Sequence, residues 1–389
     1  MAGSYRKLKN GKWELCVSLG FDSLTGKRIR KFKTIEATGK RAVEKILADF
    51  VLENQSSKDY NVNITVKEFS ELWINDYVKK NLKKKTISDY MDILERVNTC
   101  LGKIMLKNLK PTHLIRFYTM LGEDGARKDG KPGGLSNKTI KHHHLVLSSM
   151  LNTAYQWELI KENICNRVDA PKLDNKNVTA LTIIQTKSLI NALHDEPLKY
   201  KLIVMIALFT GLRRGEIMGL EWNSIDFNES TITVFYTSSY TADFGIYEDT
   251  PKTFTSKRTN FVPEEIIKML NDYRVECEIL KEKAGKKWVE SDRIFTQKNG
   301  NPMSPETISK WFPKFIRRKK LPYTKFHGLR HIHGSILLAL GLDPASVSEQ
   351  LGHANLQMLF QVYGHNIRKN SSEVADIMKS ALLDDLNKT

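Results

Sequence analysis

The N-terminal segment of the chain alternates apolar and polar side chains before it changes to a helical repeat. Trp13, Leu15 and Val17 fall on one side of an extended chain, because successive residues of a strand face opposite sides. The turn-forming stretch FDSLTGK then leads into the basic run RIRKFKT, which can return as a partner strand. Apolar residues at helical spacing follow from Val43 to Val51. The pattern predicts a three-stranded sheet that carries one helix.

A helical repeat governs most of the remaining chain. Thr65 and Glu68 form a capping box before a first helix, and KKKTISDYMDILERV opens a second. Pro111 suits the first turn of a third helix, and SNKTIKHHHLVLSSMLNTAYQW is a long fourth. Thr182 with Gln185 then caps a further helix. The pattern then predicts a helix over KLIVMIALFTG (201–211) and a strand over STITVFYT (230–237). A polar hairpin follows the strand, and helices resume after it.

These elements predict a multidomain, mainly α protein. We expect a sheet-plus-helix domain at 1–58, a helical domain at 63–165, a linker at 166–181 and a mixed α+β domain with a C-terminal tail at 182–389. A chain of 389 residues with 41% hydrophobic residues can form two or three cores. Its longest apolar runs are too short for a bilayer, and its N-terminus lacks the apolar core of a signal peptide. We therefore expect a soluble, intracellular protein.

Charge narrows the choice of partner. Lys and Arg total 61 against 44 acidic residues, a net charge of +17, which favours nucleic acid or another anionic surface. A highly soluble basic enzyme is the alternative. The four cysteines contain no CxxC pair and predict neither a disulfide framework nor a cysteine metal site.

Two basic groups are candidate DNA contacts. Residues 1–45 hold 12 Lys and Arg against 4 acids, and a sheet with basic side chains on its open face would suit DNA. A solvated charged strand is the alternative for that segment. Three more lysines stand beside the first turn of the second long helix, where backbone N–H and ammonium groups can jointly receive a phosphate. The candidates are Arg28, Arg30, Lys31, Lys33, Lys83, Lys84 and Lys85.

The stretch FHGLRHIH at 326–333 suggests either a metal site or an anion site. A zinc-protease helix needs H-E-x-x-H, and Gly328 stands where the glutamate would be. His327 and Arg330 are three residues apart and share a helix face, and an imidazole with a guanidinium is a phosphate-binding pair. The consecutive histidines of KHHHL point around their helix and do not converge. We predict an anion site and no metal.

Two further stretches carry candidate chemistry. In TGLRRGEIMGLEW, Glu216 lies three residues after Arg213 and can fix its guanidinium, which leaves other donors for an anion. An ordinary helical ion pair is the alternative. In LGHANLQMLFQVYGH, Tyr363 follows His353 by ten residues, and a tyrosine becomes a nucleophile where positive surroundings lower its pKa from about 10. Taken singly, both residues are ordinary core or surface positions.

The boxes TGLRRGE, PKT, HGLRH and LGH, followed by a tyrosine ten residues later, together resemble the tyrosine recombinases of the phage integrase family. The resemblance is strong over residues 176–370. The two upstream parts resemble, in pattern, the arm-binding and core-binding domains of lambda-type and conjugative-transposon integrases. It implies that Arg213 and Arg330 clamp the scissile phosphate and that His327 and His353 donate hydrogen bonds to it. Glu216 would orient the first arginine.

The resemblance also implies the roles in bond breaking. Tyr363 would attack the phosphorus, and Lys252 would protonate the departing 5′-hydroxyl, with Lys257 as the fallback because the register of the hairpin is open. Lys257 and Arg258 are also expected to contact DNA. Two guanidiniums and two imidazoles would supply preorganised donors for the charge that develops on the phosphate.

The implied activity is that of a site-specific DNA recombinase, the integrase of a phage or integrative mobile element, which cuts and rejoins DNA through a covalent 3′-phosphotyrosine. It implies no cofactor. The implied partners are core and arm attachment sites in double-stranded DNA, a homotetramer on DNA, an excisionase and a host DNA-bending protein, with no membrane. The implied location is the bacterial cytoplasm, with nucleoid association in the bound state. A type IB topoisomerase-like enzyme and a non-catalytic DNA-binding regulator on the same scaffold are the alternatives.

The tail SSEVADIMKSALLDDL is amphipathic. It either packs on its own domain or, as the resemblance implies, docks on a neighbouring protomer.

Overall fold

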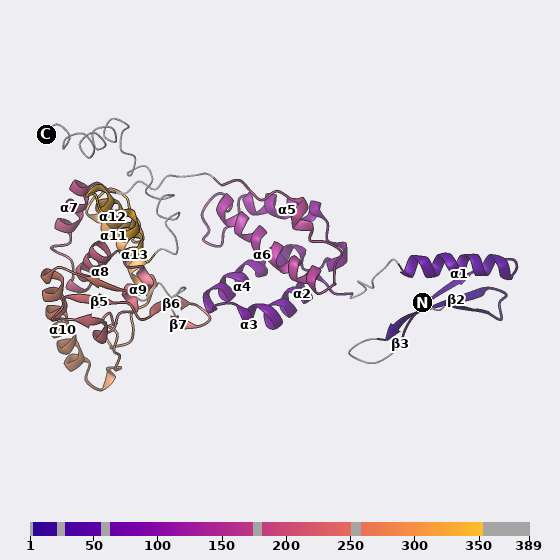
Figure 1. Cartoon of the computed structure of the whole chain (residues 1–389), viewed down its shortest axis with the longest axis horizontal. Coiled ribbons are helices and arrows are strands. Elements are labelled where there is room, and N and C mark those ends of the chain that lie inside the picture. Colours follow the sequence, from indigo (N-terminus) through magenta and orange to yellow (C-terminus); the bar gives the residue numbers. More distant parts are fainter. Residues whose placement is uncertain (1–2, 22–27, 56–62, 174–180, 250–257, 353–389) are drawn as a thin grey trace, which may run out of the picture. The chain divides into compact units, whose positions relative to one another are not determined.

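The fold was obtained as a computed structural model, which describes residues 3–21, 28–55, 63–173, 181–249 and 258–352 (Figure 1). It is mainly α, with small antiparallel sheets, as the sequence predicts. The chain divides into two compact units, residues 1–174 (unit 1) and 175–389 (unit 2). The division falls inside the segment that was expected to be a linker. In the parts that the structure describes, every helix is too short or too polar to span a lipid bilayer.

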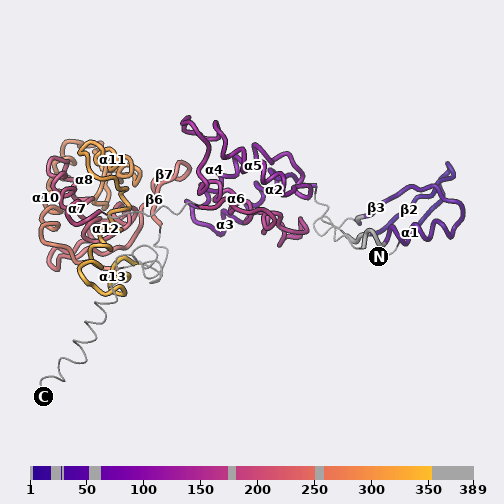
Figure 2. Tube along the Cα trace, turned by 90° about the horizontal axis from the view of Figure 1, so that it is seen from above, coloured from indigo at the N-terminus to yellow at the C-terminus, as the bar shows by residue number. Residues whose placement is uncertain are grey.

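Unit 1 begins with an antiparallel sheet in the order β1-β2-β3, which one helix covers (Figures 1 and 2). The alternating apolar positions predict this arrangement, since Leu15 and Val17 are fully buried against Val43 and Phe50 of the helix. The elements are β1 (Gly3–Lys7), β2 (Trp13–Phe21), β3 (Arg28–Ile35) and α1 (Lys40–Gln55).

The register of β2 and β3 places two of the basic side chains on the face that the helix covers. Lys31 pairs with Val17 and Lys33 with Leu15, and paired residues of an antiparallel ladder share a face. The ammonium group of Lys33 lies 5.5 Å from the ring centre of Phe50 on α1. Both lysines therefore border the small core.

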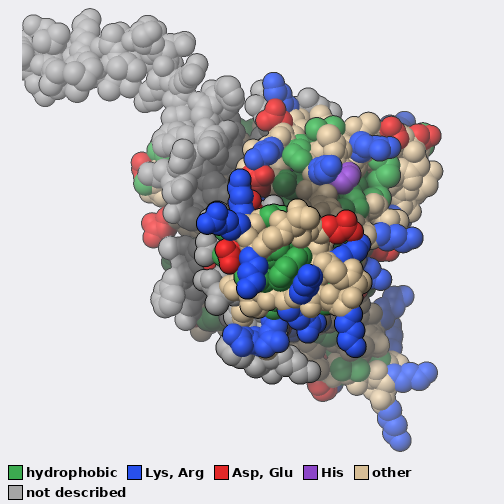
Figure 3. Space-filling view, turned by 90° about the vertical axis from the view of Figure 1, so that its right-hand side faces the viewer, with side chains coloured by type: hydrophobic (Ala, Val, Ile, Leu, Met, Phe, Trp, Pro, Cys, Tyr) green, Lys and Arg blue, Asp and Glu red, His purple; other side chains and the backbone are tan. Residues whose placement is uncertain are grey.

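The open face of the sheet carries the two arginines. Arg30 pairs with Ser18, and Arg28 donates a hydrogen bond to the Ser18 hydroxyl at 3.1 Å. Phe32, on the same face, is 57% exposed. The expectation that all four basic residues line the open face is wrong for the two lysines, because side chains alternate along a strand. Figure 3 shows Lys and Arg side chains on the surface, interspersed with acidic and apolar ones.

The rest of unit 1 is a helical domain with its own core. The Thr65 hydroxyl accepts a hydrogen bond from the Glu68 amide at 3.2 Å, which confirms the predicted capping box. Trp73 is fully buried and donates to the Thr153 hydroxyl at 3.0 Å, which joins the first and last long helices. The elements are α2 (Val66–Trp73), η1 (Ile74–Val78), α3 (Lys79–Asn81), α4 (Lys84–Leu101), η2 (Leu106–Asn108), α5 (Pro111–Gly122), α6 (Asn137–Gln156) and η3 (Ile164–Arg167).

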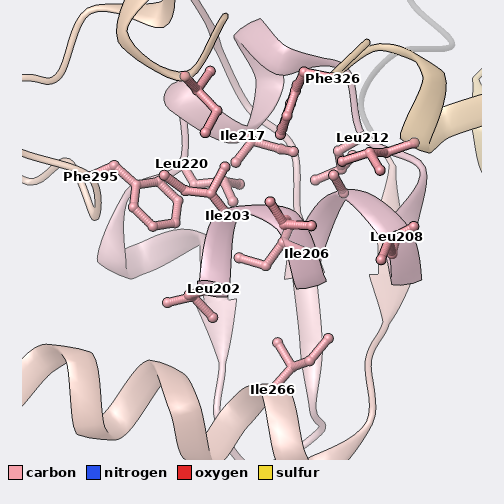
Figure 4. Packing of buried hydrophobic residues seen from close by; sticks show 14 of the residues in the cluster. Leu202, Ile203, Ile206, Leu208, Leu212, Ile217, Leu220, Ile266, Phe295 and Phe326 are labelled. Atoms are coloured by element: carbon pink, nitrogen blue, oxygen red, sulfur yellow. The ribbon is translucent and has the colours of Figure 1, made fainter. Parts of the chain in front are cut away.

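Unit 2 packs helices around α8, whose apolar residues face neighbours on several sides (Figure 4). Leu202, Ile203 and Ile206 of α8 are fully buried, and α8 contacts α9, α10 and α12. The helices are α7 (Ile183–Ala192), α8 (Leu198–Thr210), α9 (Arg214–Met218), η4 (Trp222–Ser224), α10 (Glu264–Ala284), η6 (Gly285–Lys287), α11 (Pro305–Arg318), α12 (Gly328–Ala339) and α13 (Pro344–Leu351). The capping box of Thr182 and Gln185 at the start of α7 is present, as predicted.

The strand predicted over STITVFYT is shorter than expected: β5 ends at Thr233, and the next strand, β6, begins at Thr237 in a different sheet. One sheet has the order β4-β5-β8 and the other pairs β6 with β7, with β4 at Ile225–Asp226, β5 at Thr231–Thr233, β6 at Thr237–Thr241, β7 at Gly245–Asp249 and β8 at Thr259–Phe261. After it leaves the first sheet, the chain packs β6 closely on α9. A Cβ at Gly215 would lie 2.6 Å from Thr237, and one at Gly219 would lie 2.7 Å from the Tyr236 carbonyl. Two glycines therefore permit this contact.

Replacing Leu202 by alanine should lower the free energy of unfolding of unit 2 by about 2–5 kcal/mol, because the change leaves a cavity in a fully buried part of the core. Ile184→Ala is the matched control in the same unit, since Ile184 is 78% exposed and its loss should cost less than about 0.5 kcal/mol. Urea unfolding monitored in both variants measures the difference. Equal effects would contradict the central place of α8.

Candidate active site

The end of α8 fixes one of the two candidate phosphate-binding arginines. Gly211 ends the helix in the left-handed region, with φ +63°, and its carbonyl accepts a hydrogen bond from Arg330 Nη1 at 2.8 Å. A Cβ at this position would lie 2.6 Å from Leu351 and 2.8 Å from His333, so only glycine fits without a shift. Arg330 comes from α12 and is 3% exposed. The helix terminus thus holds a buried guanidinium.

The second arginine, Arg213, stands directly before α9 and is fixed by the helix that it opens. Glu216 accepts from the Arg213 backbone amide and from its guanidinium Nη1, both at 2.8 Å. Arg213 Nη2 also donates to the Gly352 carbonyl at 3.1 Å, while the side chain remains 38% exposed. The spacing of three residues therefore produces the contact that the sequence predicts, and part of the guanidinium still faces solvent.

Glu216 is a buried carboxylate between two cations. Its side chain is 3% exposed, and its second cationic partner, Arg258, lies 2.8 Å away and is 8% exposed. Burial alone would raise the pKa of Glu216. The charge and hydrogen bond of Arg258, with the amide and charge of Arg213, outweigh burial and bring that pKa below its usual value. The carboxylate is therefore an anion at neutral pH.

His327 lies at the start of α12, beside both arginines. It lines a pocket of about 540 Å³ together with Arg213, Arg214, Tyr323 and other residues. Although the residue keeps an exposed surface, its pKa is lowered to about 4, mainly by partial desolvation and in addition by the nearby His331, Arg330, Arg213 and Arg214. His327 is therefore a neutral imidazole at pH 7.

Neither histidine cluster of the sequence assembles a metal site. The rings of His327 and His331 meet edge to face, with centroids 5.1 Å apart. In the other cluster, His143 contacts the Thr139 carbonyl at 2.8 Å and His144 the Tyr118 hydroxyl at 3.1 Å, so the two rings serve different partners. Among the residues that the structure describes, no group of three His, Cys, Asp or Glu side chains is placed to hold a metal ion.

The structure brings together four of the expected site residues from two sequence boxes, TGLRRGE and HGLRH. Arg213, Glu216, His327 and Arg330 gather where α8, α9 and α12 begin or end. The remaining candidates Lys252, Lys257, His353 and Tyr363 lie outside the described residues.

The basic candidates outside this cluster have mixed environments. Lys83, Lys84 and Lys85 are exposed at the start of α4, and Lys85 makes an ion pair with Asp89 at 2.7 Å. Arg258 departs from the expectation of a DNA-facing side chain, because its guanidinium is buried and bound inside the protein. No local signal in PKTFTSKR indicates that role.

Comparison with known proteins identifies the chain. The model of the phage integrase family matches residues 180–370, and that of the N-terminal SAM-like domain of phage integrases matches residues 65–121. The ICEBs1 integrase of Bacillus subtilis (strain 168) is 29% identical over 97% of this chain and 100% of its own length. The chain belongs to the phage integrase family of tyrosine recombinases. It is an enzyme, a site-specific DNA recombinase.

Solved recombinases share the fold. The Tn1549 transposon integrase in complex with a circular intermediate DNA gives a TM-score of 0.65 at 23% identity, over 82% of this chain and 99% of that chain. A lambda integrase tetramer bound to a Holliday junction gives 0.56 at 17% identity, over 94% and 96%. The multidomain, mainly α fold predicted for the recombinase is confirmed.

The imidazole of His327 should titrate with a midpoint near pH 4 in the folded recombinase, because desolvation and neighbouring cations disfavour its charged form. NMR of ring resonances across pH 3–8 measures it. The same resonance in urea serves as the control and should titrate near the ordinary value of about 6.5. A folded-state midpoint close to the urea value would show that the ring faces bulk solvent.

Proposed function

We propose that the recombinase binds the scissile phosphate of DNA at Arg213, His327 and Arg330 and breaks the strand with Tyr363. The observation that carries this proposal is the preorganisation of the two arginines. Each is fixed by hydrogen bonds to the protein, one through Gly211 and the other through Glu216, before any substrate is present. Donors held in advance need no reorganisation when negative charge develops, and one such donor is typically worth about 10²–10³-fold in rate.

The reaction conserves the energy of the phosphodiester. The Tyr363 phenolate attacks the phosphorus and forms a 3′-phosphotyrosine bond, while the bond to the 5′-oxygen breaks and Lys252 gives that oxygen a proton. A 5′-hydroxyl of the partner strand then gives its proton back to Lys252, attacks the phosphotyrosine and releases the phenolate, so the number of ester bonds is unchanged. The positive field of the arginines favours the phenolate. His353 adds a further donor to the phosphate.

The neutral state of His327 defines its role in this scheme. An imidazole with a pKa near 4 carries one N–H and no charge at pH 7. It therefore acts as a hydrogen-bond donor to the phosphate and leaves the proton transfer to Lys252. Because Arg213, Arg214 and Arg330 already act on His327, a neutral donor adds binding without further repulsion between like charges.

Contacts with DNA beyond the scissile phosphate involve unit 1. Arg28 and Arg30 on the open face of the sheet suit arm-site DNA, and the exposed lysines 83–85 suit the backbone of the core site. Tethering the sheet domain to the rest of the chain raises its effective concentration at a nearby arm site. The similarity to the ICEBs1 integrase supports DNA integration as the activity. An integrative mobile element as the source of the substrate DNA, with an excisionase and a DNA-bending protein as further partners, is part of our proposal.

The assembly that we propose is a homotetramer on two DNA sites, as in the lambda integrase bound to a Holliday junction. Unit 2 offers an apolar pocket of about 320 Å³ lined by α7, α8, α12 and α13, with Leu208, Ile336 and Leu337 among its residues. The amphipathic tail is the occupant that we propose, supplied by a neighbouring protomer.

Tyr363→Phe should form no covalent adduct with a nicked suicide substrate that carries the attachment site, because phenylalanine lacks the attacking oxygen. Adduct formation is read by denaturing gel electrophoresis. Tyr323→Phe is the matched control, since Tyr323 is 72% exposed beside the pocket but follows none of the expected spacing, and it should still form the adduct. An adduct with Tyr363→Phe would disprove the assignment of the nucleophile.

A chain that ends at Arg368 should bind a single core site but fail to form tetramers, because it lacks the segment proposed to link protomers. Sedimentation with and without site DNA measures the assemblies. Ile336→Asp in the full chain should reproduce the defect, since a carboxylate would oppose entry of an apolar helix. Persistence of tetramers in the truncated chain would show that the tail packs on its own domain.

A further inference from the structure

Arg258 joins three segments of unit 2. It stands directly before β8 and donates through Nη2 to Glu216 at 2.8 Å and through Nε to the Gln350 carbonyl, near the end of α13, at 2.9 Å. A second guanidinium nitrogen lies 3.4 Å from the other Glu216 oxygen. The side chain is 8% exposed, so these contacts form in the interior.

Arg213 contacts the same carboxylate and the same end of α13. It binds Glu216 Oε1 at 2.8 Å and the Gly352 carbonyl at 3.1 Å. Gly352 caps α13 in the left-handed region, with φ +62°, and a Cβ there would lie only 3.0 Å from Arg258 Nη1. Two guanidiniums, one carboxylate and the terminus of one helix therefore form a single packed junction.

We propose that Arg258 is a positioning residue for the recombination reaction, which fixes Glu216 so that Glu216 can orient Arg213 toward the scissile phosphate. This inference rests on the proposed function of Arg213. Arg258 also lies six residues after Lys252, and the helix end that it holds is followed directly by His353. The residue thus anchors the segments next to two further groups of the proposed mechanism.

The shape of the side chain explains why arginine occupies this position. A guanidinium offers five donors in a rigid plane and can bind a carboxylate and a carbonyl at the same time. An ammonium group keeps the charge but is a point donor on a flexible stem. Lysine should therefore preserve the anion at Glu216 without holding the end of α13.

Removing the guanidinium should make the reaction depend on the protonation of Glu216. The charged groups that act on this carboxylate are Arg213 and Arg258, whereas Arg214 pairs with Glu306 of α11. Arg258 supplies the two largest effects that lower the pKa of Glu216, so its removal should let burial raise that pKa. As the pH falls, the carboxyl then gains a proton and loosens its hold on Arg213. The defect should therefore be largest at low pH. His327 and Arg330, at the start of α12, border the same site. Both residues are unchanged in every variant.

The experiment compares Arg258→Met, Arg258→Lys, Glu216→Gln and the double variant Arg258→Met with Glu216→Gln. Single-turnover adduct formation on suicide DNA is measured from pH 6 to pH 9, together with affinity for site DNA and thermal unfolding. We expect Arg258→Met to bind DNA within about 3-fold of wild type but to lose at least about 10-fold in rate at pH 6.5, with partial recovery toward pH 9.

The other variants separate positioning from a general loss of structure. Arg258→Lys should be slower than wild type with a pH profile of wild-type shape. The double variant should be no slower than Glu216→Gln alone, because residues that act through one another are not additive. If Arg258→Met does not fold, the Lys variant and its profile decide, and a wild-type rate in that variant refutes the proposal.

Three results would overturn the inference. They are a weaker affinity for DNA with an unchanged pH profile, wild-type rates in Arg258→Met, and additive losses in the double variant. If wild type forms the adduct and Tyr363→Phe does not, the proposed function holds whatever the outcome for Arg258. If wild type itself forms no adduct, the proposed function fails, and the inference fails with it.

Discussion

Burial of the Glu216 carboxylate between Arg213 and Arg258 is the interaction on which the rest of the site depends. A buried charge without a partner costs several kcal/mol, so a carboxylate that is 3% exposed must keep its cations close. Those cations come from the start of α9 and from the residue before β8, and both also bind carbonyl groups at the end of α13. One electrostatic requirement therefore fixes the relative positions of three segments that are distant in sequence. Arg330 is held close to the same segments, because it donates to the carbonyl of Gly211, a residue that precedes Arg213 by two positions.

Local signals allowed much of this architecture to be predicted from the sequence. Capping boxes at Thr65 and Thr182, the glycine that ends α8 and the apolar repeats of the long helices each act within a few residues, and each is confirmed. The contact between Arg213 and Glu216 belongs to the same class, because it spans a single turn. Features of this kind are specified by short-range geometry and need no knowledge of the tertiary fold.

The features that could not be predicted all depend on distant partners. The strand expected over STITVFYT ends at Thr233, and β6, which follows in another sheet, packs on α9 through two glycines about twenty residues earlier in the chain. The face on which Lys31 and Lys33 lie depends on the register with β2. The burial of Arg258 depends on an acidic side chain that precedes it by 42 residues. A single sequence shows which residues are available for such contacts, but not which of them contact one another.

A net charge of +17 indicates a polyanionic partner, yet three arginines are part of the protein interior. Arg258 and Arg330 are buried, and Arg293 is 6% exposed and binds the Gly219 carbonyl together with Glu248. Guanidinium groups suit such positions because they satisfy several acceptors in a fixed plane and stay charged at every physiological pH. Under the proposed function, the basic residues therefore have two separate uses, one in contacts with DNA phosphates and one in contacts inside the protein. Counting cations overstates the number of DNA contacts, and the burial of each guanidinium is what distinguishes the two uses.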